Sequence, residues 1–194
     1  MVMLDFPRLR QSKDYDCGAI VIQGVLEYYG FDVREDKIIK LAGTRKKATQ
    51  VRNIARVLDK YGLKAKARKF TLSEVKKFIS KGYPVILVLQ AWTDKNKAKW
   101  ENWTNINPKK DLVEVDWSDD WKDGHYVVAI GYDKNKMYFE DPGSVFKEYL
   151  TFDELMKRWH DVGGNKDKGK KYVHYGIVAI GKKVYDGRKK VKMG

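Results

Sequence analysis

The sequence predicts an α+β fold in which N-terminal helices pack on a C-terminal antiparallel β-sheet. Two observations predict it. Patterns typical of helices cluster early in the chain, and patterns typical of strands cluster late. A polar turn at 133–136 also separates two strand patterns, which makes these strands antiparallel neighbours in a hairpin. This segregation favours an α+β fold over an alternating, parallel α/β fold.

The first predicted helix runs from Cys17 to Tyr29 and is apolar on most sides. Such a pattern is typical of a central, buried helix. Its β-branched residues are modest helix formers, so burial rather than intrinsic propensity should stabilise it. We expect Asp16 to be its N-cap and Gly30 to end it in a left-handed conformation. Cys17 would then lie in the first turn.

Four further helices are predicted. Two of them have one apolar face. The other two begin with a capping box, in which a Thr and a Glu three residues later accept hydrogen bonds from each other's backbone N–H groups. A hydrophobic staple, a contact between two apolar residues, flanks each box. The predicted ranges are 34–41, 50–61, 71–80 and 151–159, and the capping boxes are Thr71 with Glu74 and Thr151 with Glu154.

Five segments are rich in Val, Ile, Tyr and Phe and are bounded by turn residues, which predicts strands. Their ranges are 64–69, 84–89, 126–132, 136–140 and 173–180.

The stretch 91–123 fits neither pattern and predicts a long loop or insertion. It contains many charges and five of the six tryptophans: Trp92, Trp100, Trp103, Trp117 and Trp121. Long loops in compact domains tend to be functional or mobile. The aromatic side chains could line a substrate cleft or simply cover the sheet, and the sequence leaves both open.

The length of 194 residues suits one domain spanning 1–194, with a basic tail at about 182–194. A composition of 43% hydrophobic residues is typical of a globular protein. No apolar run approaches the roughly 20 residues of a membrane-spanning helix. The segment 1–10 also lacks the apolar region of a signal peptide. We therefore expect a soluble, cytoplasmic chain without a membrane span.

The net charge of +14 comes from 40 Lys and Arg against 26 Asp and Glu. Such a surplus attracts polyanions at low salt, so nucleic acid is one conceivable partner. The basic residues are spread along the chain, however, and no groove-reading helix or stacking motif accompanies them. A solvated basic surface is the favoured interpretation.

Cys17 is the only cysteine, which excludes an intramolecular disulfide and a zinc site of the CxxC type. A lone Cys is usually an inert core thiol. A catalytic thiol, by contrast, needs stabilisation of its thiolate, which a helix N-terminus and a nearby imidazole supply. The position expected for Cys17 provides the first of these.

His125 is the candidate imidazole, because it opens a predicted strand. An imidazole that serves a thiol must give its other nitrogen to an acceptor, commonly a carboxylate. The hairpin brings the end of the next strand back alongside His125, and Asp141 lies there. Gln11, six residues before Cys17, could supply an amide N–H to a developing oxyanion, together with the backbone N–H of Cys17. No metal or cofactor is expected, since three His without a clustered acid make a zinc site improbable.

Five motifs follow one another along the chain: Gln11, Asp16-Cys-Gly-Ala19, Tyr28-Tyr-Gly30, Gly124-His-Tyr-Val-Val128 and Asp141-Pro142. This order resembles that of the bacteriocin-processing cysteine peptidases, from about residue 8 to about residue 180. The resemblance implies a papain-like fold and a peptide or protein substrate, cut after a double glycine. It also implies that Cys17 is the nucleophile, His125 the base, Asp141 its orienting acid and Gln11 the oxyanion residue.

The chain departs from that family in two respects. It has neither the membrane spans nor the GxxxxGK phosphate-binding loop of an ABC exporter, with which such domains are often fused. The tryptophan-rich stretch also enlarges the region before His125, where substrate choice could be altered. Three alternatives stay open: an amidase or acyl transferase using the same residues, a peptide-binding module without catalysis, and a nucleic-acid-binding protein. The sequence does not predict the oligomeric state.

Overall fold

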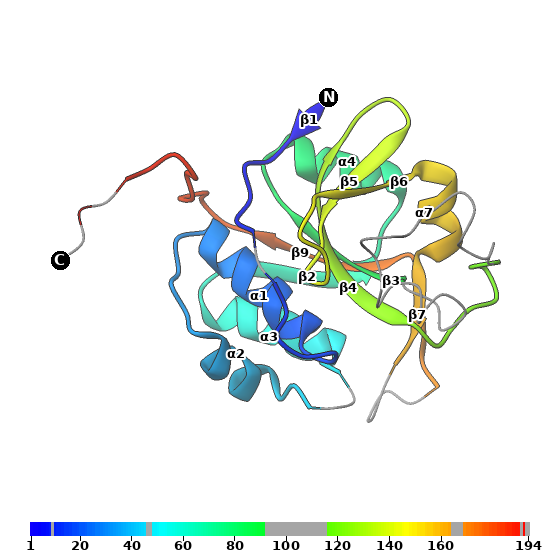
Figure 1. Cartoon of the computed structure of the whole chain (residues 1–194), viewed down its shortest axis with the longest axis horizontal. Coiled ribbons are helices and arrows are strands. Elements are labelled where there is room, and N and C mark those ends of the chain that lie inside the picture. Colours follow the sequence, from blue (N-terminus) through cyan, green and yellow to red (C-terminus); the bar gives the residue numbers. More distant parts are fainter. Residues whose placement is uncertain (9, 46–47, 92–115, 164–168, 191, 193–194) are drawn as a thin grey trace.

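The computed structural model describes residues 1–8, 10–45, 48–91, 116–163, 169–190 and 192. Its centre is an antiparallel sheet in the order β2-β9-β3-β4-β5-β6, with β1 paired to β4 (Figure 1). A separate two-stranded ribbon is formed by β7 and β8. The strands are β1 Val2–Met3, β2 Lys64–Lys69, β3 Val85–Gln90, β4 Gly124–Tyr132, β5 Lys136–Glu140, β6 Glu148–Thr151, β7 His160–Val162, β8 Lys171–Val173 and β9 Tyr175–Ile180.

The first three helices lie together on one side of the molecule, with α1 against β4 and α3 against β2 and β9 (Figure 1). Helix α4 lies apart from them, beside β1, β3 and β4. The helices are α1 Cys17–Tyr28, α2 Glu35–Ala42, α3 Val51–Lys60, α4 Leu72–Ser80 and α7 Phe152–Arg158. The predicted fold class, helices packed on an antiparallel sheet, is confirmed. Over the described ranges, no helix has the length and apolar character needed to cross a membrane.

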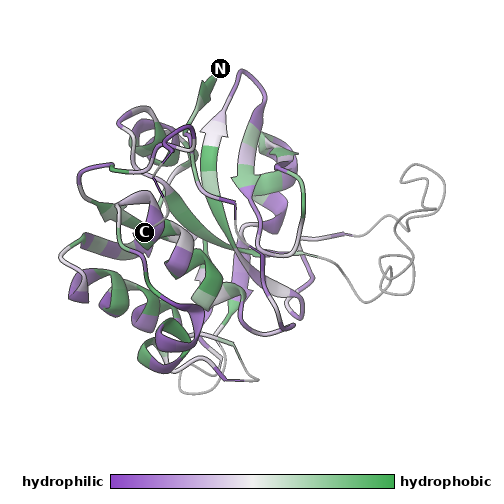
Figure 2. Cartoon of the chain, turned by 60° about the vertical axis from the view of Figure 1, so that its left-hand side comes forward, coloured by the Kyte–Doolittle hydropathy of each residue, from purple (hydrophilic) through white to green (hydrophobic). Residues whose placement is uncertain are grey.

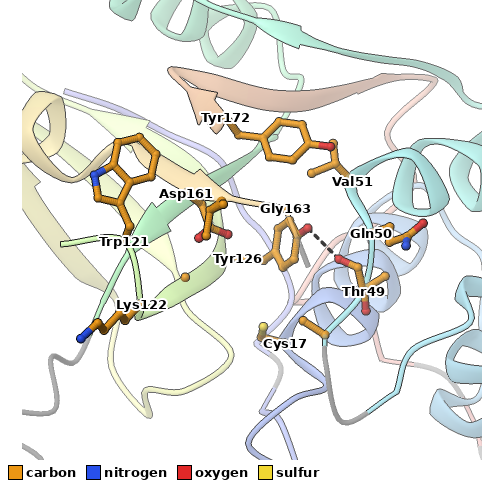
Figure 3. Close-up of a pocket in the computed structure, with 13 residues that line it drawn as sticks. Cys17, Thr49, Gln50, Val51, Trp121, Lys122, Tyr126, Asp161, Gly163 and Tyr172 are labelled. Carbon is orange, nitrogen blue, oxygen red and sulfur yellow. Dashed lines mark hydrogen bonds between the residues drawn. The ribbon is translucent and has the colours of Figure 1, made fainter. Parts of the chain in front are cut away.

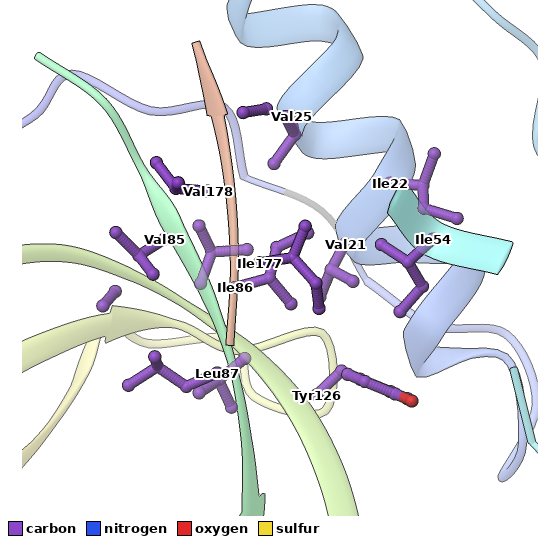
Figure 4. Packing of buried hydrophobic residues seen from close by; sticks show 14 of the residues in the cluster. Val21, Ile22, Val25, Ile54, Val85, Ile86, Leu87, Tyr126, Ile177 and Val178 are labelled. Atoms are coloured by element: carbon purple, nitrogen blue, oxygen red, sulfur yellow. The ribbon is translucent and has the colours of Figure 1, made fainter. Parts of the chain in front are cut away.

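The core lies between α1, α3 and the central strands. Val21 and Val25 of α1 face the side chains of β3 and β9, whereas Ile22 faces Ile54 of α3 (Figure 4). All six residues of β3 are buried. Green, hydrophobic segments accordingly occupy the inner strands and the inward faces of the helices in Figure 2, with purple segments outside. Burial on nearly every side explains why α1 forms despite its β-branched residues.

Both predicted capping boxes are present, at Thr71 with Glu74 and at Thr151 with Glu154. The predicted strand 173–180 is wrong in one respect, because His174 has a φ of 51° and divides it into β8 and β9. Strands β1, β6 and β7 were not predicted from the sequence. Each of them spans only two to four residues, too few for a period-2 pattern to be visible.

The tail predicted at about 182–194 is described through residue 190, and at residue 192. The backbone N–H groups of Val184 and Tyr185 donate to the carbonyl of Tyr28, 3.2 and 3.1 Å away. Gly30, with a φ of 87°, makes the left-handed turn expected after α1. A Cβ at Gly30 would lie 2.8 Å from the Val184 side chain, so the tail also requires glycine there. Most of the predicted insertion, residues 92–115, lies outside the described residues.

Replacing Ile86 by Ala should destabilise the protein by about 2–5 kcal/mol, because removing this buried side chain creates a cavity between α1 and the sheet. Urea unfolding would measure the loss. Met156→Ala is the control, since this α7 side chain is 39% exposed and its truncation should change the unfolding free energy by only about 0.5 kcal/mol. Similar small effects of both substitutions would contradict the assigned core.

Candidate active site

Cys17 lies in the first turn of α1 and is 5% exposed. The next residue, Gly18, allows a close approach: a Cβ there would lie 2.6 Å from Thr49 Cβ and 3.3 Å from the Tyr126 ring. The Tyr126 hydroxyl donates a 2.7 Å hydrogen bond to the carbonyl of Thr49. These contacts fasten the start of α1 between β4 and the segment that precedes α3. Cys17 is therefore held against the strand that carries His125.

His125 lies near the start of β4, and Asp141 directly follows β5. The hairpin pairs these strands with Val128 opposite Glu140. His125 Nε2 and Asp141 Oδ1 are 2.7 Å apart, and the two residues are only 5% and 3% exposed. Gly143 N–H donates to the same carboxylate oxygen at 2.7 Å. The structure thus brings two of the predicted residues into a buried hydrogen bond, with the carboxylate held by a backbone donor.

The imidazole of His125 interacts with Cys17 as well as with Asp141. Burial alone would lower the pKa of His125, but the negative charges of Asp141 and Cys17, with hydrogen bonds to both, raise it to about 10. Because Nε2 is bound to Asp141, Nδ1 is the nitrogen left for the sulfur. The arrangement places the imidazole of His125 between the carboxylate of Asp141 and the sulfur of Cys17.

Asp16 occupies the N-cap position of α1, but its side chain makes no capping hydrogen bond. The predicted cap is wrong in this detail. The fully buried carboxylate instead accepts hydrogen bonds from Ser12 Oγ at 3.0 Å and from Lys13 N at 3.3 Å. Asp16 therefore closes the turn that leads into α1, rather than capping the helix.

Gln11 is hydrogen-bonded both to the segment that carries Asp141 and to the turn that precedes α1. Its backbone N–H donates to the carbonyl of Pro142 at 2.8 Å, next to Asp141. Its side-chain Nε2 donates to the carbonyl of Lys13 at 3.1 Å, in the turn before α1. Since a side-chain amide has two N–H groups, the second remains for another acceptor.

Two carboxyl groups near Asp141 were not anticipated from the sequence. Burial, followed by the negative charge of Asp141, raises the pKa of Glu148 to about 7. Burial likewise raises the pKa of Glu140 to about 7, although Lys147 and Arg8 oppose the shift. A protonated Glu148 can donate a hydrogen bond to Asp141 and so support the ionised form of that carboxylate.

A cavity of about 190 Å³ opens beside Cys17 (Figure 3). Its walls come from β4, from β7 and β8, from the segment before α3 and from residues 121–122. Asp161 of β7 is the one carboxylate among the described lining residues, and it was not predicted from the sequence. Within the described ranges, no group of three or more His, Cys, Asp or Glu could hold a metal ion.

The ring of His125 should stay protonated at pH 8, where an ordinary His with a pKa of about 6.5 is neutral, and lose its proton only near pH 10. Asp141→Asn should lower this pKa, because it removes the strongest interaction that raises it. NMR titration of the ring protons measures both values. His174, whose pKa is lowered by partial burial and by Lys69, is the internal control and should titrate alike in both proteins. Titration of wild-type His125 near pH 6.5 would contradict the arrangement.

Three solved structures are similar to this fold. The peptidase domain of Streptococcus ComA has 18% identity and a TM-score of 0.60, covering 88% of this chain and 95% of that one. A double glycine motif protease from an AMS/PCAT transporter, in complex with the leader peptide, has 18% identity and a TM-score of 0.60, covering 92% and 93%. A C39-like protein from Bacillus anthracis has 16% identity and a TM-score of 0.65, covering 94% and 98%.

No curated protein matches the chain. At these identities the solved structures establish the fold, which is that of the C39 papain-like peptidase domains. The model of the Peptidase_C39 like family, in turn, matches residues 3–167, so the chain belongs to this family.

Proposed function

We propose that the chain is a cysteine peptidase whose nucleophile is Cys17, with His125 as acid and base and Asp141 orienting the imidazole. The buried 2.7 Å hydrogen bond between His125 Nε2 and Asp141 Oδ1 carries the proposal. It fixes which nitrogen of the ring is left for Cys17 and stabilises the charged imidazolium. Membership of a peptidase family supports the same activity.

The chemistry takes two steps. The Cys17 thiolate attacks the carbonyl carbon of a peptide bond, and the tetrahedral intermediate breaks down as His125 Nδ1 gives its proton to the leaving amine. This leaves a thioester on Cys17 and a neutral imidazole. His125 then takes a proton from water as the water attacks the thioester, and the thiolate leaves with release of the carboxylic acid. Asp141 stays ionised throughout.

Gln11 would hold the oxyanion together with the backbone N–H of Cys17. The first N–H groups of a helix have no partner within the helix, so that of Cys17 is suited to a negative charge. The hydrogen bonds of Gln11 to Pro142 and Lys13 support this role, because they fix the amide in the turn that precedes α1 before substrate arrives.

The substrate we propose is a peptide segment of a larger chain, with leader-peptide removal as the specific reaction. A solved relative of the same fold is in complex with a leader peptide, which supports a peptide substrate. The cavity beside Cys17 has room for little more than one side chain, which is consistent with recognition of an extended segment.

Iodoacetamide should alkylate Cys17 rapidly at neutral pH, and His125→Ala should slow the reaction at least tenfold because the imidazolium no longer stabilises the thiolate. As Cys17 is the only cysteine, intact mass measures the reaction without ambiguity. His174→Ala is the matched control and should react like the wild type. Equally slow alkylation of wild type and His125→Ala would favour a peptide-binding module without catalysis.

Gln11→Ala should lower kcat for peptide cleavage about 10²–10³-fold, the usual cost of losing one oxyanion donor. Alkylation of Cys17 by iodoacetamide forms no oxyanion, so its rate should be nearly unchanged. Comparing the two rates separates oxyanion stabilisation from a general disturbance of the site. Parallel losses of both would indicate that Gln11 only shapes the turn before α1.

A further inference from the structure

Asp161 faces the cavity beside Cys17 from the opposite strand ribbon. In Figure 3 its carboxylate points from β7 toward the side of the cavity where Cys17 lies. The volume of about 190 Å³ is below the roughly 300–1,000 Å³ of typical small-molecule sites. The cavity therefore suits one side chain of a bound peptide.

The surrounding structure holds this carboxylate in place. Gln90, which is fully buried in β3, donates from Nε2 to Asp161 Oδ1 at 3.2 Å and to the carbonyl of His160 at 3.1 Å. The other end of the same amide accepts from Asp123 N–H at 2.9 Å. A Cβ on Gly124 would clash with the carboxylate oxygens of Asp161. Glycine directly before His125 thus makes the position of Asp161 possible.

Asp161 carries a negative charge that is only partly balanced within the described part of the chain. Burial raises its pKa to about 6, although hydrogen bonds from the Val162 N–H and from Gln90 and the charge of His125 oppose the shift. The group is therefore mostly ionised at neutral pH. None of the described Lys or Arg side chains forms an ion pair with it. Lys122 lines the same cavity, but its amine points away in Figure 3. The charge of His125 acts on Asp161, but that imidazole is already hydrogen-bonded to Asp141. Keeping a buried carboxylate without an ion pair of its own is costly, which favours a role in binding.

Three aromatic residues, Trp121, Tyr126 and Tyr172, line the same cavity. The ammonium groups of Lys171 and Lys170 lie over the rings of Trp121 and Tyr172, 4.8 and 5.0 Å from the ring centroids. Such rings also accommodate the methylene groups of a Lys or Arg stem. The cavity therefore combines a fixed negative charge with the apolar walls that a long cationic side chain requires.

We propose that Asp161 makes this cavity a specificity site for a Lys or Arg side chain of the peptide substrate, next to the bond that is cut. The inference rests on the proposed peptidase function and names a substrate class for it. Such a preference would distinguish this chain from an enzyme that recognises only two glycines, because glycine has no side chain to occupy the cavity.

Cleavage of matched peptides tests the inference. The peptides differ at one of the two positions that flank the scissile bond. At each position, a peptide with Lys is compared with one that has uncharged norleucine, and a peptide with Arg is compared with one that has uncharged citrulline. At one position, wild-type kcat/KM should favour the cationic peptide about tenfold to a hundredfold, as for hydrogen bonds to a charged group. Asp161→Asn should bring this ratio close to one. Because the kcat/KM values of the cationic and the uncharged peptide are compared within one variant, a general loss of activity does not change their ratio.

Asp153→Asn is the control, since it removes the same charge from an exposed position at the start of α7 and should preserve the ratio. Binding of the same peptides to Cys17→Ala gives a second readout that does not depend on cleavage. Cleavage without a cationic preference at any position would overturn the inference and leave the peptidase function standing. Absence of cleavage would refute the peptidase function and, with it, a role of Asp161 in cleavage specificity. Selective binding of cationic peptides to Cys17→Ala would then support only the recognition of a cationic side chain.

Discussion

The hydrogen bond between His125 and Asp141 is the constraint on which the proposed chemistry depends. It is possible because the β4–β5 hairpin returns the chain to the same place within sixteen residues, and because both side chains are nearly excluded from water. The same hairpin anchors Gln11 through the carbonyl of Pro142. Cys17 approaches from the helical side, where Gly18 lets α1 pack closely on Tyr126 and Thr49. The site therefore forms where the two layers of the fold meet.

Burying charged groups is unfavourable unless each has partners, and breaking a buried pair typically costs about 3–5 kcal/mol. Asp141 meets this requirement with His125, with the N–H of Gly143 and with the carboxyl of Glu148. Asp161 meets it with the amide of Gln90 and the N–H of Val162, but forms no ion pair with a described Lys or Arg side chain. The contrast separates the two carboxylates by role: the first is satisfied within the protein, and we propose that a ligand completes the second.

Much of the fold could be predicted from the sequence because its signals are local. The capping boxes at Thr71 and Thr151, the apolar run of α1 and the turn at 133–136 each lie within a few residues. The hairpin also made Asp141 the natural neighbour of His125. Asp161 could not be found in this way, since its strand is three residues long and its place beside Cys17 depends on pairing with β8 and on the buried Gln90. Gly124 was the only local sign in the sequence that another group, here the Asp161 carboxylate, approaches the backbone closely.

The proposed chemistry requires that a carboxylate and an imidazolium keep Cys17 as a thiolate. Ultraviolet absorbance of the thiolate tests it most directly, because the protein has a single cysteine and the spectrum of Cys17→Ser can be subtracted. At neutral pH the wild type should show thiolate absorbance, and Asp141→Asn should show much less. A wild-type spectrum without thiolate at neutral pH, or one that Asp141→Asn leaves unchanged, would contradict the account.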